Sequence, residues 1–481
     1  TPGDVTDFVP VFQNSKTTDD NIAIATQYTM NFIEDAGVIK MDFLGLRTLS
    51  IIDRTLELIK VNQNIDLDID KIDKFDTKTY ELISEGKTIG VFQFESGGMQ
   101  DYLKKLKPQS LEELTAMNAL YRPGPMASIP DYIERKHGRQ KTNYLHPIME
   151  PVLKNTYGII VYQEQVMQLV QTVGNFTLGE ADVLRRAMGK KLRSEVDRMK
   201  PKFIQGAEAN GVPGNLAIEI FELIDKFADY GFNKSHSYVY SWIAYQTAYL
   251  KAHFPAEFLA ANMTAELNNQ AKIVELIDEA KTFNITIAPP DINTSISSFT
   301  VKNNTIYFGL AAVKGIGINP VEHIVEVRKE KPFESFYDFV KRTDPKYINR
   351  RVLESLIFAG AFDHIANGQR RALYEAIDDA LNFARAQSKN ENMIDLFAIN
   401  AETKSATEPK LPIVTEWSEK ERLQHEKEVL NFYVTGHPLN EFESIVKSFS
   451  NSNIFRYLNK DEDINDNDLP KIEKVRFCGL I

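Results

Sequence analysis

Apolar residues recur at helical spacing along much of the chain, and this periodicity constrains the fold more than any other feature of the sequence. It is clearest over 48–61, 160–190 and 214–229. A further helix is predicted to start at a capping box formed by Ser110 and Glu113 and to stop before Pro123. The chain has 481 residues, which is more than one hydrophobic core usually supports and suggests roughly three domains. We therefore predict a multidomain, mostly helical protein with minor β structure, in the α+β class.

The composition of the chain excludes several classes of protein. The single cysteine, Cys478, rules out an internal disulfide and a cysteine-rich zinc site, which fits a reducing compartment. No apolar run approaches the roughly 20 residues that cross a bilayer, and no secretion signal is recognisable, so we expect a cytoplasmic protein with no membrane partner. The net charge of -11 does not exclude nucleic acid, because residues 185–202 hold eight Lys or Arg against two acidic residues.

Residues 36–46 show the period-two alternation of a β-strand, with Val38, Lys40 and Asp42 on one face. A carboxylate beside a lysine on the same face suits a divalent cation held near a phosphate group. The alternative is an acidic and a basic residue on the surface of an edge strand. The pattern alone leaves both interpretations open.

A basic cluster lies in LRRAMGKK, residues 184–191, where Arg185 and Arg186 precede Lys190 by about one helical turn. Guanidinium groups bind phosphate oxygens through two parallel hydrogen bonds, and lysine adds a compact charge. The cluster therefore suits a triphosphate. The alternative is a solvated basic face of a helix.

The motif YGFNKSHS, residues 230–237, opens a further helix that we predict from about Ser237 to His253. Free amide groups and the helix dipole make a helix start favourable for phosphate. The candidate nucleotide contacts in this motif are Asn233, Lys234 and His236. The alternative is that a serine only caps the helix and the histidine is half-buried and satisfied.

A domain boundary is predicted near residue 288, where a turn-like segment precedes a predicted β-hairpin at 300–310. Further along, a turn containing Lys314, Gly315 and Gly317 separates two helical stretches. Glycines in such a turn let backbone amides approach a DNA phosphate closely, as in a helix-hairpin-helix that binds DNA without reading its sequence. The alternative is a tight turn between helices without a ligand.

Residues 385–412 are polar and weakly periodic, which predicts a linker. The linker carries an apolar island formed by Ile394, Asp395, Leu396 and Phe397. Exposed apolar anchors usually indicate an interface with a partner. The alternative is that they fold back onto the neighbouring helical domain.

Several longer strings occur in a fixed order: IKMDFLGLRTL, GVFQFESGGMQ, ALYRPGP, TYGIIVYQEQVMQ, LRRAMGKK and YGFNKSHS, then INRRVLESLIFAGAFD and FYVTGHPLN. Together they resemble the C-family replicative DNA polymerases of bacteria, the DNA polymerase III alpha family. The resemblance covers nearly the whole chain, and its motifs are highly specific.

The resemblance implies template-directed transfer of nucleotides from dNTPs to a primer 3′-hydroxyl, with two Mg²⁺ ions held by three palm carboxylates. Asp42 matches the third carboxylate and is thus an implied metal ligand. The family's first two carboxylates lie in an upstream Asp-x-Asp strand, which nothing before Asp42 matches, so we expect this chain alone to be inactive. Because it starts at Thr1 and stops in the strand-like run 475–481, we also expect a larger functional unit.

The same resemblance implies roles for the other candidates. The implied triphosphate contacts are Lys40, Arg185 and Arg186, and those on the nucleotide and template side are Lys190, Asn233, Lys234 and His236. The apolar island resembles a sliding-clamp motif, in which Met393 replaces the usual leading glutamine. The implied partners are a DNA primer-template, dNTP, a sliding clamp and other subunits of the replicase holoenzyme.

The predicted domains are the end of a palm with a polymerase-beta-like nucleotidyltransferase fold at 1–48, helical fingers at 49–288, a clamp-binding region at 289–470 and the start of an OB fold at 471–481. The third part contains the helix-hairpin-helix, at about 305–365, and the linker at 385–412. Two alternatives remain: a lesion-bypass paralogue of the same family, and a non-catalytic module that binds DNA or docks on a clamp.

Overall fold

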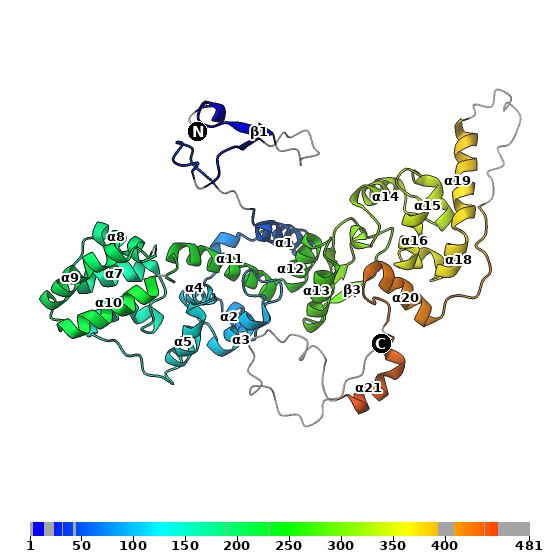
Figure 1. The fold of residues 1–481 in the computed structure, drawn as a ribbon. Coiled ribbons are helices and arrows are strands. Elements are labelled where there is room, and N and C mark those ends of the chain that lie inside the picture. Colours follow the sequence, from blue (N-terminus) through cyan, green and yellow to red (C-terminus); the bar gives the residue numbers. More distant parts are fainter. Residues whose placement is uncertain are drawn as a thin grey trace, which may run out of the picture. The chain divides into compact units, whose positions relative to one another are not determined.

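The computed structural model describes residues 3–13, 24–30, 32–41, 45–189, 191–228, 230–392, 408–436 and 438–450. The chain forms two compact units, Thr1–Leu49 and Ser50–Ile481. Figure 1 shows the helices and strands with the labels used below. The described residues are mostly helical with two small sheets, which confirms the predicted class.

The first unit contains a short antiparallel pair, β1 (Val11–Gln13) with β2 (Ile24–Thr26), and a 3₁₀ turn at Val5–Asp7. The strand predicted over 36–46 is not found in the described residues, which form a turn and irregular backbone there. Gly37 adopts a left-handed conformation (φ 80°), and its amide closes that turn on the Glu34 carbonyl. The alternation exists in the sequence, but a strand also needs a neighbour that pairs with its backbone.

The second unit begins with helices packed around α11 (Lys234–His253), which contacts both α2 and α4. This region contains α2 (Thr77–Ser84), α3 (Gly97–Leu106), α4 (Leu111–Leu120) and α5 (Ile129–Lys136), and it is preceded by α1 (Arg47–Gln63), which begins in the last residues of the first unit. The predicted start of α4 is confirmed, because the Ser110 hydroxyl accepts a hydrogen bond from the Glu113 amide (3.4 Å). The helix ends before Pro123, as expected because proline lacks the backbone N–H that would continue the helix.

A second group of helices forms a bundle with its own hydrophobic core (Figure 1). Its helices are α6 (Glu150–Leu153), α7 (Gln163–Gly174), α8 (Leu178–Gly189), α9 (Arg193–Ala209) and α10 (Gly214–Ala228). Leu169, Leu184 and Phe203 are fully buried in its core. The backbones of α7 and α9 come so close that a Cβ on Gly206 would lie only 1.9 Å from the Gly174 carbonyl oxygen. Glycine is therefore required at residue 206 by packing.

The helices α12 (Pro255–Ala265) and α13 (Gln270–Thr282) lead into a three-stranded sheet. Its strands are β3 (Thr286–Ala288), β4 (Thr300–Lys302) and β5 (Thr305–Tyr307), in the order β3-β5-β4. The predicted hairpin is confirmed by the antiparallel pairing of β4 with β5. Asn303 and Asn304 both have positive φ angles, which a two-residue hairpin turn requires.

The remaining helices are α14 (Ile318–Glu330), α15 (Phe336–Arg342), α16 (Arg350–Phe358), α17 (Asp363–Ala366), α18 (Arg370–Glu375), α19 (Ile377–Asn392), α20 (Glu419–Leu430) and α21 (Glu443–Phe449). Single 3₁₀ turns lie at Ile69–Lys71, Pro125–Ser128, Pro147–Met149, Lys154–Thr156, Leu310–Ala312 and Asn440–Phe442. Helix α19 continues through Asn392, so residues 385–392 of the predicted linker are helical, and residues 393–407 lie outside the described residues.

Candidate nucleotide and nucleic-acid sites

Motifs that are distant in the sequence meet at the start of α7. The Gln163 amide donates to the Phe232 carbonyl (2.9 Å), and the Phe232 amide donates to the Val161 carbonyl (3.1 Å). Arg122, from ALYRPGP, donates through Nη2 to the Tyr230 carbonyl (2.7 Å) and lies 4.3 Å from the centre of the Phe232 ring. Three of the quoted motifs therefore form one site.

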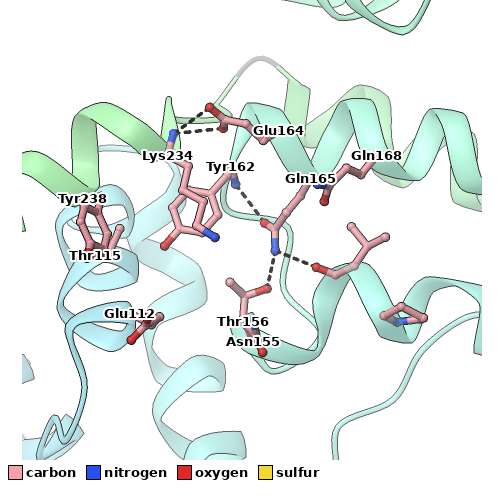
Figure 2. A pocket seen from close by; sticks show the side chains of 12 residues that line it. Glu112, Thr115, Asn155, Thr156, Tyr162, Glu164, Gln165, Gln168, Lys234 and Tyr238 are labelled. Atoms are coloured by element: carbon pink, nitrogen blue, oxygen red, sulfur yellow. Dashed lines mark hydrogen bonds between the residues drawn. The ribbon is translucent and has the colours of Figure 1, made fainter. Parts of the chain in front are cut away.

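The start of α11 is already capped by side chains (Figure 2). The Asn233 side chain accepts a hydrogen bond from the His236 amide (2.8 Å). The Glu164 carboxylate accepts from the Lys234 amide (3.1 and 3.0 Å) and from Asn233 Nδ2 (3.2 Å). The Glu164 carboxylate already accepts the hydrogen bond of the Lys234 amide. A phosphate would therefore have to bind through the exposed side chains of Lys234 and His236 or displace Glu164. The nucleotide-binding roles of Asn233, Lys234 and His236 stay predictions.

The two arginines of α8 share one carboxylate but differ in their surroundings. Arg185 donates through Nε and Nη2 to Asp182 Oδ1 (3.2 and 2.8 Å) and through Nη1 to Gln163 Oε1 (3.2 Å). Among the described residues Arg186 donates only to Asp182 Oδ2, and it is 63% exposed, against 24% for Arg185. The hydrogen bonds from Arg186 and Arg185 lower the pKa of Asp182. Arg185 therefore links α8 to α7, whereas Arg186 faces solvent.

The basic run at 185–202 is largely neutralised by acidic residues of the same bundle. Its further ion pairs are Arg193–Asp225, Arg198–Glu195, Lys200–Glu222 and Lys202–Glu180. The hydrogen bond from Lys202 lowers the pKa of Glu180 to about 2. The local excess of basic residues in the sequence is therefore not a uniform cationic surface in the folded bundle.

A cavity of about 340 Å³ lies beside Lys234 (Figure 2). Its lining combines charged, amide and aromatic groups, including Glu112, Asn155, Tyr162, Glu164, Gln168 and Lys234. Gln165 also lines it, but its side chain is fully used, since its oxygen accepts from the Val161 and Tyr162 amides and its nitrogen donates to Thr156. The sequence predictions missed this cavity, because Glu112 and Asn155 lie in no recognisable motif.

The predicted DNA-binding turn lies between the 3₁₀ turn Leu310–Ala312 and α14. Gly315 has a φ of 88°, which favours glycine, and Gly317 is the N-cap of α14. The Lys314 amide is hydrogen-bonded to the Val429 carbonyl (2.8 Å), so α20 holds the turn in place. The amides of Gly315 and Gly317 have no hydrogen-bond partner among the described residues.

The other predicted residues lie elsewhere. Lys40 is an exposed residue of the first unit, whereas Asp42, Lys190 and the segment 394–397 are outside the described residues. Within the described ranges, no group of three or more His, Cys, Asp or Glu side chains could hold a metal ion. No helix of the described part of the chain is long and apolar enough to cross a membrane.

Comparisons with known proteins identify the family to which the chain is similar. Residues 48–211 match the bacterial DNA polymerase III alpha subunit finger domain, and residues 284–373 match a helix-hairpin-helix motif. The chain is 44% identical to the DNA polymerase III subunit alpha of Borreliella burgdorferi, over 99% of this chain and 41% of that protein. Identity to the Escherichia coli K12 subunit is also 44%, over 92% of this chain and 39% of that one. The chain thus spans about two fifths of the length of these relatives, and it belongs to the family of bacterial DNA polymerase III alpha subunits.

Proposed function

We propose that this chain supplies nucleotide and DNA binding to template-directed DNA synthesis, in which a nucleotide is transferred from a dNTP to a primer 3′-hydroxyl. The observation that carries the proposal is the dipeptide Gln163-Glu164 at the start of α7. Its first side chain accepts from Arg185, and its second accepts from the backbone of Lys234. This junction supports a joint role for the two cationic motifs in binding one polyanionic ligand.

Arg186 is the residue best suited to bind the triphosphate. Its guanidinium is exposed, and a planar fork can exchange the Asp182 carboxylate for phosphate oxygens without a change of partner chemistry. Arg185 orients this helix through its bonds to Asp182 and Gln163. The exposed side chains of Lys234 and His236 supply further donors at the start of α11.

The two Mg²⁺ ions implied by the family would activate the primer hydroxyl and stabilise the leaving pyrophosphate when bound. The described residues do not fit them, because they contain no cluster of three or more potential ligands. Asp42 is one candidate carboxylate, and two ions need more ligands than one side chain provides. We therefore assign binding and orientation of the nucleotide to this chain, which alone should be inactive.

The proposed partners follow from the other two motifs. The turn at Lys314, Gly315 and Gly317 would hold the backbone of the primer-template duplex. Leu396 and Phe397, within the segment 394–397, would insert into a pocket of a sliding clamp. Association with other replicase subunits is proposed on the family alone.

Primer extension tests the proposal. The measurement compares this chain with a polypeptide that joins it to an upstream palm carrying the Asp-x-Asp carboxylates. With Mg²⁺, a primed template and four dNTPs, the longer polypeptide should extend the primer and this chain should not. A longer polypeptide that binds primer-template but never incorporates nucleotide would refute the enzymatic role and favour a non-catalytic binding module.

A further inference from the structure

Two cationic side chains flank the helix-hairpin-helix turn. Lys314 belongs to the turn itself, and Arg351 lies in the first turn of α16. Gly315 brings the two elements together, because a Cβ built on it would lie 3.6 Å from Arg351 Nε and 3.3 Å from Ser355 Oγ. Both cations are exposed, and neither side chain forms an ion pair or a hydrogen bond with any of the described residues.

The neighbouring residue Arg350 shows that α16 does have acidic partners within reach. Arg350 donates to Glu354 (2.9 Å) and to Asp378 (2.5 Å) and is thereby held on the surface. Arg351 has no such partner, although it lies in a helix's first turn, where a positive charge is unfavourable. A cation at this position lies beside two glycine amides that have no partner in the described part of the chain, and this combination indicates an anionic ligand from outside the chain.

We propose that Arg351 is a further DNA-binding residue, which contacts the same backbone phosphate as Lys314 and the amides of Gly315 and Gly317. The ligand class is the phosphodiester backbone of duplex DNA. A guanidinium fork matches two phosphate oxygens, and neither a glycine amide nor Arg351 at this place reads a base. The inference rests on the proposed DNA binding by the turn and adds a contact from α16, outside that turn.

The salt dependence of duplex binding tests this contact. The 481-residue chain and its variants are titrated with a fluorescent DNA duplex across a series of NaCl concentrations. Each phosphate contact contributes about 0.9 to the slope of log affinity against log salt, so Arg351→Gln should reduce the slope by about 0.9. Affinity at low salt should fall roughly tenfold. Arg351→Lys should keep the slope, because it keeps the charge.

Arg350→Gln is the matched control, because it removes an adjacent arginine whose donors are already paired within the chain. It should leave the slope unchanged, and thermal unfolding of each variant reports any loss of fold. If Lys314→Gln lowers the slope but Arg351→Gln behaves like Arg350→Gln, the inference fails and the proposed role of the turn survives. If the wild-type chain does not bind duplex at any salt concentration, both fail.

Discussion

Replacing Arg186 and Arg185 separately with alanine should produce two different defects. Arg186 is exposed and, within the described part of the chain, bound only to Asp182, so its removal takes away a ligand-binding group and little of the fold. Arg185 ties α8 to Gln163 of α7, so its removal takes away a link between helices. Both substitutions shorten the same kind of side chain in the same helix and serve as each other's control.

The size of each effect follows from the contacts. A charge-assisted contact to the triphosphate contributes about 1.5 to 3 kcal/mol, and breaking the surface pair with Asp182 costs up to about 1 kcal/mol. Arg186→Ala should therefore lose about 1 to 2 kcal/mol of nucleotide binding, a roughly 5- to 30-fold decrease in kcat/KM for dNTP. Arg185→Ala should lower the free energy of unfolding by about 1 to 2 kcal/mol, because it removes partly buried hydrogen bonds.

Two assays separate these effects. Steady-state primer extension by the longer polypeptide measures kcat/KM for dNTP, and urea unfolding of this chain measures stability. Unchanged kcat/KM for Arg186→Ala would show that Arg186 does not bind the nucleotide and only forms part of a solvated helix face. Equal destabilisation by both substitutions would show that the distinction between a binding arginine and a linking arginine is wrong.

Three further predictions concern stability, each measured by urea unfolding of this chain. Gly206→Ala should destabilise it by about 1 to 3 kcal/mol, because the new Cβ would collide with the α7 backbone, and a wild-type midpoint would contradict this close approach. Glu426→Ala should cost about 3 kcal/mol or more, since it removes a buried carboxylate that accepts from Arg370 and from the Val434 and Thr435 amides, while Arg370 keeps its pair with Asp363; a small loss would mean that water replaces the carboxylate. Burial lowers the pKa of Lys251 to about 8, against the opposing effect of Glu279, so the unfolded state binds more protons between about pH 8 and pH 10.5. The stability of the wild type relative to Lys251→Met should therefore rise with pH across this window, and a constant difference would contradict the lowered pKa.

Local patterns in the sequence predicted those elements that are fixed by residues close to one another in the chain. Ser110 caps α4 within three residues, and the asparagines between β4 and β5 supply the positive φ angles of the hairpin. The start of α11 was placed at Ser237, three residues late, because the residue that caps it is Asn233. The alternation at 36–46 did not predict the turn and irregular backbone of residues 36–41, because a strand depends on a partner that the segment itself does not encode.

The site itself depends on contacts between residues far apart in the sequence. Gln163 and Phe232 are paired through their backbones although about 70 residues separate them, and no periodicity in either segment indicates this pairing. In contrast, the pairing of Asp182 with Arg185 and Arg186 could have been found, because residues three and four apart lie on one face of a helix. The spacing of these residues on α8 would have shown that Asp182 is a counterion for both arginines of the basic cluster.

Both candidate phosphate sites, on α8 and at the start of α11, are thus occupied by carboxylates of the chain, and Glu164 allows the consequence to be tested. Glu164→Gln keeps the shape and one acceptor for the Lys234 amide but removes a charge from the positive end of α11, so the free energy of unfolding should fall by about 1 kcal/mol. The same change removes a negative charge from the place that a triphosphate would approach, so KM for dNTP in the longer polypeptide should not rise. A KM that rises several-fold without a loss of stability would show instead that the carboxylate positions Lys234 for the nucleotide.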